Sequence, residues 1–271
     1  PYHRRFTPDP ASIKSAMVGG IVMNNASGMC CGTHANSYRM LESVRIILPD
    51  GTILDTADEQ SKTQFKLTHA RFLQTIRDLK WQTMQNKRLV EQIRTKYSIK
   101  NLTGLTLLPF IEYEDPFDII AHLMVGSEGT LAFLSNITMR TGEDYPYSAS
   151  ALLLYPTTRE ACDEVIRMKK TGALSAAEYF DRKAMQTVEN DFPELKGQPD
   201  DAGAVLIKIE AGTQEELEHK KQILGVEGFT SDPALVNKYW AMRSGISPAV
   251  GGTREIGTTC LIEDIAFPIE Y

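Results

Sequence analysis

The stretch HLMVGSEGTLAFL, at residues 122–134, places a Gly-Ser-Glu-Gly turn between two short apolar runs. Apolar runs of strand length on both sides of a glycine turn predict a strand, a tight turn and a second strand. Glycine has no Cβ, so its backbone turns tightly and comes close to a ligand where any other residue would collide. The stretch is therefore a candidate for a turn that approaches a bound molecule.

A second glycine element, GGIVMNNASG at residues 19–28, lies upstream. Neither element has the spacing GxGxxG or GxxxxGK[ST], so neither predicts a Rossmann nicotinamide site or a phosphate-hydrolysing loop. Exposed backbone N–H groups and short amide side chains can nevertheless hold a pyrophosphate without positive side chains. Each element taken alone is also compatible with a plain turn that binds nothing.

Composition and charge limit the classes of function. The 271 residues are enough for one large domain or two ordinary ones, and the net charge of −6 argues against nucleic acid as a partner. No apolar run approaches the ~20 residues that a bilayer-spanning helix needs, and residues 1–6 are not a secretory signal. We therefore expect a cytoplasmic protein, free or peripheral on the inner face of the cell membrane. Because the first residue is proline, we also expect the chain to be an internal fragment.

The cysteines and histidines do not predict a metal site. Cys30, Cys31, Cys162 and Cys260 contain no CxxC spacing, and the five histidines contain no HxxxH spacing. The adjacent thiols of Cys30 and Cys31 have two interpretations: a pair of small, partly buried side chains, or a redox-sensitive pair.

The first half of the chain predicts a hairpin followed by helices. Residues 42–48 and 52–55 are strand patterns around a Pro-Asp-Gly turn. From residue 59 to about 100, apolar residues recur at three- and four-residue steps without Gly or Pro. This helical excursion either packs on its own domain, which is the preferred interpretation, or binds a partner.

The second half predicts an antiparallel sheet. Strand patterns alternate with helices capped by Asp, Thr or a Thr-Glu capping box, and the last helix begins after Asp232. This order predicts a ferredoxin-like α+β domain with its helices on one face. The change of rhythm places the domain boundary between residues 143 and 144. The predicted strands are residues 149–155, 176–180, 204–210 and 226–229.

The glycine elements, together with LESV at 41–44 and LPDGT at 48–52, resemble the flavin domain of the vanillyl-alcohol-oxidase (PCMH-type) superfamily of FAD-linked oxidoreductases. The resemblance is to the D-lactate dehydrogenase and glycolate oxidase subunit branch. It implies FAD as the cofactor, with the first element passing the flavin and pyrophosphate and the second closing on the adenosine side. The implied cofactor-binding residues are Gly19, Gly20, Asn24, Asn25, Gly28, Gly126, Ser127, Gly129 and Leu134.

The C-terminal part resembles the substrate (cap) domain of the same branch, through KYWAMR at 238–243 and EDIAFP at 263–268. The resemblance implies that Arg243 holds the substrate carboxylate, because a guanidinium gives two parallel charge-assisted bonds. A plain surface ion pair is the alternative. Glu263 either shapes the pocket or ends a strand, and it stands near the position where related enzymes carry a lysine. Arg254 is a second candidate anion ligand.

These features imply the second half of a flavin domain, residues 1–143, followed by a truncated substrate domain, residues 144–271. The implied reaction is oxidation of a D-2-hydroxy acid, first of all D-lactate, by hydride transfer to flavin. A quinone, a cytochrome or an iron–sulfur domain would accept the electrons. The alternatives are glycolate or D-2-hydroxyglutarate as substrate, or a non-catalytic association module. We expect the fragment alone to be inactive, because the first FAD loop and a histidine-containing segment lie outside it.

Overall fold

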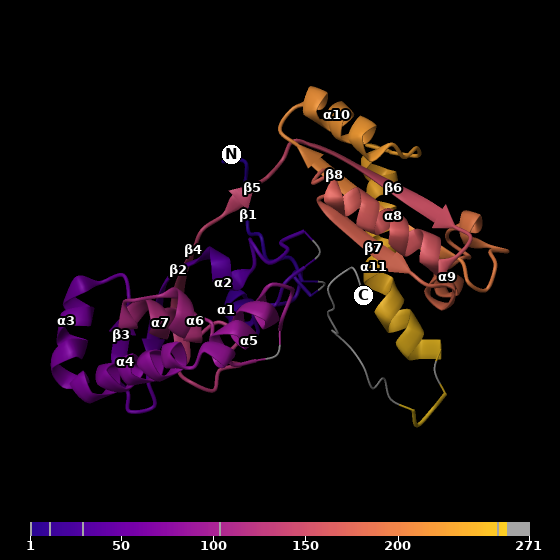
Figure 1. The fold of residues 1–271 in the computed structure, drawn as a ribbon. Coiled ribbons are helices and arrows are strands. Elements are labelled where there is room, and N and C mark those ends of the chain that lie inside the picture. Colours follow the sequence, from indigo (N-terminus) through magenta and orange to yellow (C-terminus); the bar gives the residue numbers. More distant parts are fainter. Residues whose placement is uncertain (1, 11, 29, 103, 254, 259–271) are drawn as a thin grey trace. The chain divides into compact units, whose positions relative to one another are not determined.

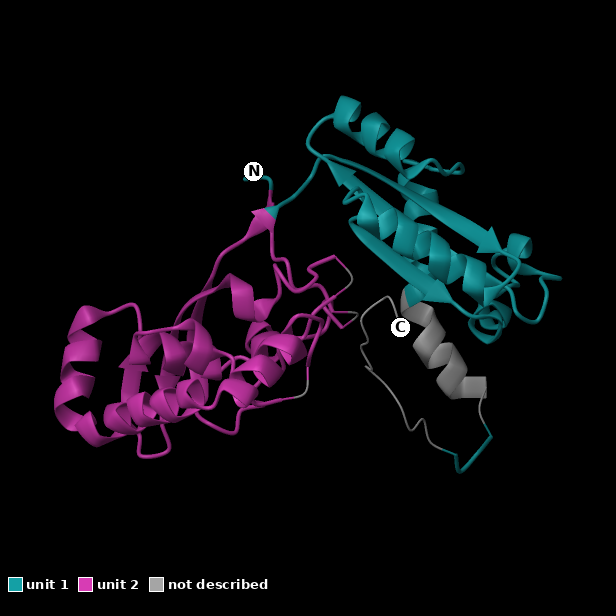
Figure 2. Ribbon diagram, in the orientation of Figure 1, with its two compact units in different colours: residues 1–3, 143–265, 269–271 teal, residues 4–142, 266–268 magenta. Residues whose placement is uncertain are grey.

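The computed structural model describes residues 2–10, 12–28, 30–102, 104–253 and 255–258 (Figure 1). The described residues form two compact units, one of residues 4–142 and one that begins at residue 143 and also includes residues 2 and 3 (Figure 2). Two short strands, β1 (Arg4–Arg5) and β5 (Gly142–Glu143), pair where the first unit begins and ends. No described helix is both long and apolar enough to cross a membrane.

The first unit is built around a three-stranded antiparallel sheet in the order β3-β2-β4. The predicted hairpin is confirmed: β2 (Leu41–Ile47) and β3 (Ile53–Asp55) pair with Ile46 opposite Leu54. Gly51 supplies the positive φ of +85° that the turn requires. β4 (Phe133–Met139) joins the other edge of β2.

Helices cover this sheet and supply most of its core. The predicted helical excursion is confirmed, but as three helices: α3 (Glu59–Thr68), α4 (Ala70–Gln85) and α5 (Lys87–Tyr97). The breaks fall at His69 and Asn86, whose backbone leaves the helical region. Neither residue is Gly or Pro, so the sequence pattern did not show them. The buried side chains of the core include Val44, Ile46, Leu54, Phe65, Leu73, Ile119 and Ile120.

The predicted strand at residues 123–125 is wrong. Helix α7 (Pro116–Leu123) ends at the first of these residues and follows the short helix α6 (Pro109–Glu112), and residues 124–126 form a turn. The Asp115 side chain accepts a bond of 2.9 Å from the Phe117 N–H and caps α7, with Pro116 in its first turn. A short apolar run that is buried on every side has the same sequence pattern in a helix and in a strand. The Asp115 cap is therefore the feature that identifies this segment as a helix.

The first glycine element begins in a helix, and only its second part, from residue 24, is a turn. Gly19 and Gly20 lie in the six-residue helix α1 (Val18–Met23), and helix α2 (Ser37–Met40) leads directly into β2. Ile21 and Val22 point into the core. Their burial against the unit outweighs the low helix propensity of two adjacent glycines.

The second unit contains a three-stranded antiparallel sheet in the order β6-β8-β7. The predicted fourth strand at residues 226–229 is wrong, since only an isolated bridge between Ser150 and Thr230 is present there. That bridge lies beside β6, where a ferredoxin-like sheet has its fourth strand. The elements are β6 (Tyr147–Tyr155), α8 (Thr158–Lys170), β7 (Ala176–Phe180), α9 (Arg182–Val188), the 3₁₀ turn η1 (Pro193–Leu195), β8 (Gly203–Ala211), α10 (Gln214–Leu224) and α11 (Pro233–Thr253).

Both faces of this sheet are covered, which corrects the prediction of helices on one face only. On the central strand β8, Val205 and Ile207 pack in one core with Leu217 of α10. Leu206 packs in a second core with Met185 of α9. Helix α11 closes the second core with Met242. A strand buried on both faces lacks the alternation that marks a solvent face, so the sequence alone did not reveal the second layer.

Replacing Asp181 with alanine is expected to destabilise the second unit by about 1 kcal/mol. The Asp181 carboxylate accepts a bond of 2.7 Å from the Ala184 N–H and caps α9, which packs on the sheet. Urea unfolding measures the change. Asp181→Asn, which keeps a capping oxygen, should retain most of the stability, and equal losses in the two variants would contradict the capping role.

Candidate functional site

The two glycine elements, about a hundred residues apart in the sequence, meet in the first unit. The Asn24 side-chain amide donates a bond of 2.7 Å to the Glu128 carboxylate. The Glu128 N–H donates to the Met23 carbonyl at 2.9 Å, and the Gly126 N–H donates to the Val22 carbonyl at 3.3 Å. The turn after α7 is therefore fastened to the end of α1 by both backbone and side-chain bonds.

A third segment, around Gly104, completes this junction. Gly126 has φ +80°, and a Cβ on it would lie 2.9 Å from the Gly104 carbonyl oxygen and 3.7 Å from the Asn25 Cβ. Gly104 itself has φ +79°. Backbone therefore approaches backbone at a distance that only glycine allows. The sequence did not predict that Gly104 lies against the glycine turn, because the two segments are separate in the chain.

A polar hollow opens beside this junction. Its lining comes from four parts of the chain, among them Asn25, Asn36, Gly104 and Val125. Tyr38, Arg39, Tyr97, Asn101 and Thr106 line it as well. Amides, hydroxyls and one guanidinium thus share the lining of the hollow with the apolar side chains of Ile99, Leu108 and Val125.

Two buried polar atoms at this junction have no hydrogen-bond partner among the described residues: Asn25 Oδ1 and Ser127 Oγ. Leaving such an atom unpaired costs about 1–3 kcal/mol, and native proteins normally satisfy buried polar groups. The hollow has a volume of about 30 Å³, so it can take one polar group of a ligand and not a whole dinucleotide. Unsatisfied amide and hydroxyl groups at this junction fit a ligand that carries many polar atoms, such as FAD, of which the hollow would hold only a part.

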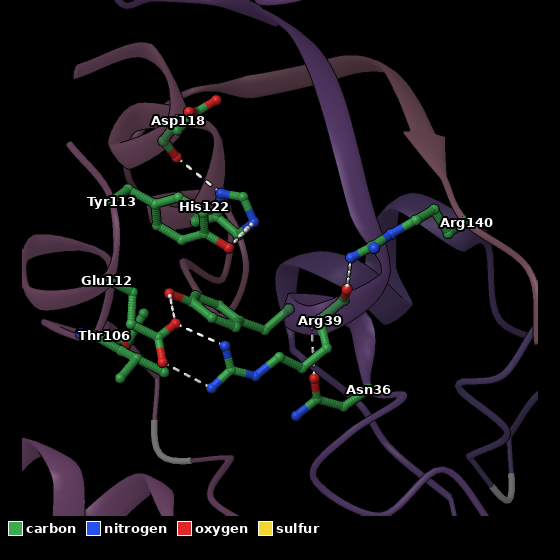
Figure 3. Close-up of polar contacts among 10 residues, drawn as sticks. Asn36, Arg39, Thr106, Glu112, Tyr113, Asp118, His122 and Arg140 are labelled. Atoms are coloured by element: carbon green, nitrogen blue, oxygen red, sulfur yellow. Dashed lines mark hydrogen bonds and ion pairs between the residues drawn. The ribbon is translucent and has the colours of Figure 1, made fainter. Parts of the chain in front are cut away.

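An ion pair shapes one wall of the hollow. Arg39 forms two parallel bonds to the Glu112 carboxylate, at 2.7 and 2.8 Å, and the Tyr38 hydroxyl donates to the same carboxylate at 3.1 Å (Figure 3). The bond from Glu112 raises the pKa of the Arg39 guanidinium, and burial raises that of the Tyr38 phenol. Both groups keep their protons and donate them to Glu112, so this wall is held rigidly by its own hydrogen bonds.

His122 lies behind this wall as a buried, neutral imidazole. Its Nδ1 bonds the Asp118 carbonyl at 2.8 Å, and its Nε2 bonds the Tyr113 hydroxyl at 2.8 Å (Figure 3). A carbonyl only accepts, so Nδ1 carries the proton and Nε2 accepts from Tyr113. The Tyr113 ring stacks on the imidazole with centroids 4.0 Å apart. His122 is therefore held in one tautomer.

We expect the first unit to lose stability below pH 6.5 through His122. Burial lowers the pKa of this imidazole below its ordinary value of 6.5. The unfolded chain then takes up the proton first, so stability is complete above pH 6.5 and falls as the pH drops, by at most about 1.4 kcal/mol per pH unit. Urea unfolding at pH 7.5 and 5.5 should show a smaller decline in His122→Gln than in the parent chain. Equal declines would refute this role.

The nine predicted cofactor-binding residues fall into three groups: four at the junction, three that border open space and two in the packing of the unit. Asn25, Gly126 and Ser127 lie at the junction, and Asn24 fastens it. A Cβ on Gly19, Gly20 or Gly129 would meet no atom within 4 Å, so these three border open space.

The other two serve the packing of the unit. A Cβ on Gly28 would lie 1.9 Å from the Asp9 carboxylate. Leu134 pairs with Ile46 in the sheet and packs on the core.

The predicted substrate residues lie at the C-terminal end. Arg243, in α11, approaches the Glu178 carboxylate of β7 with 3.4 Å between Nε and Oε2. Both side chains are about one quarter exposed, at 26% and 24%. The structure therefore contains the ion pair that was the alternative interpretation, and the guanidinium remains partly accessible. Glu263 and Arg254 lie outside the described residues.

Comparisons with known proteins agree with this arrangement. The family described as FAD binding domain matches residues 1–57, and the family described as FAD linked oxidases, C-terminal domain, matches residues 146–271. Alkyldihydroxyacetonephosphate synthase, a solved structure, has a similar fold with a TM-score of 0.55. It is 14% identical, and the match covers 92% of this chain and 41% of that protein.

Three relatives with assigned names are similar in sequence. D-lactate dehydrogenase of Archaeoglobus fulgidus is 22% identical over 68% of this chain and 30% of its own length. D-2-hydroxyglutarate dehydrogenase of Haemophilus influenzae is 24% identical over 71% of the chain and 19% of its own length. Mitochondrial D-lactate dehydrogenase [cytochrome] of Arabidopsis thaliana is 23% identical over 56% and 28%. The chain thus spans less than a third of each relative.

Glycine elements that meet at a polar hollow, an α+β second unit and two matching families lead to one conclusion. Residues 1–57 of this chain belong to the family described as FAD binding domain, and residues 146–271 belong to the family described as FAD linked oxidases, C-terminal domain.

Proposed function

We propose that this chain is part of an FAD-dependent dehydrogenase that oxidises a D-2-hydroxy acid to the 2-oxo acid. The observation that carries the proposal is the junction of the two glycine elements, where Asn25 and Ser127 keep buried polar atoms free for a ligand. The names of the relatives, two D-lactate dehydrogenases and one D-2-hydroxyglutarate dehydrogenase, support the substrate class. D-lactate is the first candidate.

The residues of the first unit would hold the cofactor. When bound, FAD accepts the hydride that leaves C2 of the substrate. Asn25 and Ser127 would bond its polar atoms. Gly19, Gly20 and Gly129, where a side chain would meet no neighbour, would let it approach the backbone. Residues 1–143 then act as the second half of the flavin domain.

Residues 144–271 would form the substrate domain. Arg243 would hold the substrate carboxylate through its planar fork, in exchange for part of its contact with Glu178. Glu263 would shape the pocket. Electrons would leave to a quinone, a cytochrome or an iron–sulfur domain.

The visible absorption spectrum of the full-length protein tests this proposal. A flavin band that bleaches on anaerobic addition of D-lactate, but not of L-lactate, is the expected result. No flavin band would overturn the cofactor assignment and favour a non-catalytic association module.

D-2-hydroxyglutarate is the second candidate, favoured by the relative from Haemophilus influenzae. A dicarboxylate needs a second cationic group near Arg243. A band that persists with D-lactate and bleaches with D-2-hydroxyglutarate would select this substrate. Bleaching of the flavin band by glycolate but by neither of the other two acids would indicate glycolate as the substrate and a smaller substrate pocket.

A further inference from the structure

A second hollow in the first unit is lined by cations. It has a volume of about 530 Å³ and is bordered by Arg4, His34, Arg39 and Arg140. The rest of its lining is Met40, Met139 and Thr141, so no acidic side chain borders it. In a chain with a net charge of −6, three arginines and a histidine around one acid-free hollow are unusual.

Two of these arginines are held by neutral partners. Arg4 donates from Nε to the Thr141 hydroxyl at 3.0 Å, and from a terminal nitrogen to the Thr141 carbonyl. Arg140 donates to the Arg39 carbonyl (Figure 3). Among the residues that the structure describes, neither Arg4 nor Arg140 pairs with a carboxylate. Each keeps its full positive charge and further N–H donors, because a guanidinium carries five.

Arg39 differs from these two. Its guanidinium is already engaged by Glu112, and its carbonyl faces Arg140. Arg39 also lines the candidate cofactor hollow, so the two hollows adjoin at this residue. The positive charge of the second hollow that no described carboxylate engages therefore comes from Arg4, which is held by Thr141, and from Arg140, which is held by the Arg39 carbonyl.

We propose that this hollow binds a phosphoryl dianion through Arg4 and Arg140. Like charges fixed around one hollow repel each other, and a dianion reverses this cost by giving each guanidinium an oppositely charged partner. Phosphate oxygens match the planar fork of arginine, and two forks suit a dianion better than a single carboxylate. The phosphoryl group has two sources: the pyrophosphate of FAD, or a separate phosphate-bearing molecule.

Calorimetric titration of the full-length protein with inorganic pyrophosphate tests the site. Arg140→Gln and Arg4→Gln should each weaken binding at least tenfold, and Arg140→Lys, which keeps the charge but loses the fork, should fall between. Arg77→Gln is the matched control, because Arg77 is an exposed arginine of α4 outside the hollow. The affinity of the Arg77→Gln variant for pyrophosphate should lie within twofold of that of the unchanged protein. Circular dichroism checks that each variant is folded.

Repeating the titration with FAD bound and after FAD has been removed identifies the source of the phosphoryl group. Pyrophosphate that binds only the FAD-free protein identifies the cofactor as the source. Equal binding to both forms identifies a separate phosphate-bearing molecule. No binding in either form, unchanged binding in both glutamine variants, or an equal loss in Arg77→Gln overturns the proposal. These outcomes do not depend on the substrate, so they are independent of the D-lactate test.

Discussion

Replacing Gly126 with alanine is expected to destabilise the first unit by about 3 kcal/mol. The new Cβ would lie 2.9 Å from the Gly104 carbonyl, and the residue would have to keep φ at +80°. The left-handed conformation alone costs about 1–2 kcal/mol in an L-residue, and the backbone contact adds overpacking. Urea unfolding combined with amide hydrogen exchange, which follows peptides of each unit separately, measures the loss.

Gly129→Ala is the matched control for this prediction. Gly129 lies in the same turn with φ +73°, but a Cβ there would meet no atom within 4 Å. It should cost only about 1 kcal/mol, the conformational part. Because Gly104 lines the candidate cofactor hollow, Gly126→Ala should also lower the FAD content of the full-length protein. Similar losses in the two variants would show that the approach to Gly104 is not what restricts this position.

Replacing Arg243 with methionine is expected to lower kcat/KM for the 2-hydroxy acid by a factor of about 10²–10³ in the full-length protein. Methionine keeps much of the apolar stem but cannot bond a carboxylate. If Arg243 holds the substrate in both the ground state and the transition state, most of the loss should lie in KM. Arg243→Lys should recover only part, since an ammonium lacks the planar fork.

Glu178→Gln separates substrate binding from a structural ion pair. Glu178 is the partner of Arg243, at 3.4 Å, so the pair is broken equally in both variants. If the arginine binds substrate, Glu178→Gln should keep kcat/KM within a few-fold of the unchanged protein, because the guanidinium is still present. Equal losses in Arg243→Met and Glu178→Gln would assign Arg243 a structural role. Unfolding of both variants in urea checks that the second unit remains intact.

Most of the secondary structure could be predicted because its causes are local. Gly51 between apolar runs specifies the hairpin, and the capping groups of Asp181 and Thr213 lie within three residues of the N–H groups they bind. The breaks at His69 and Asn86 could not be predicted, because a helix that folds back over a core ends where packing requires it.

The candidate site was predictable only in part. The glycine elements were correctly identified as a pair through their order, but their bonds through Asn24, Glu128 and Gly126 join residues remote in sequence. The roles of Gly104 and Glu112 were not predicted, because they depend on contacts with residues remote in the sequence. The only sequence feature that could have drawn attention to Gly104 is the segment NLTG at residues 101–104, which interrupts two apolar stretches.

The sequence by itself determined the hairpin and the helix starts, because short-range hydrogen bonds and backbone torsions encode them. Its motifs resemble those of FAD-linked oxidoreductases, and that resemblance indicated the family and the α+β class. Tertiary structure alone decided that residues 116–123 form a helix, that helices cover both faces of the second sheet, and that Arg4 and Arg140 border one hollow. Those outcomes depend on which buried surfaces meet and on which charges are left without an acidic neighbour. Such contacts join residues far apart in the chain, so no local pattern specifies them.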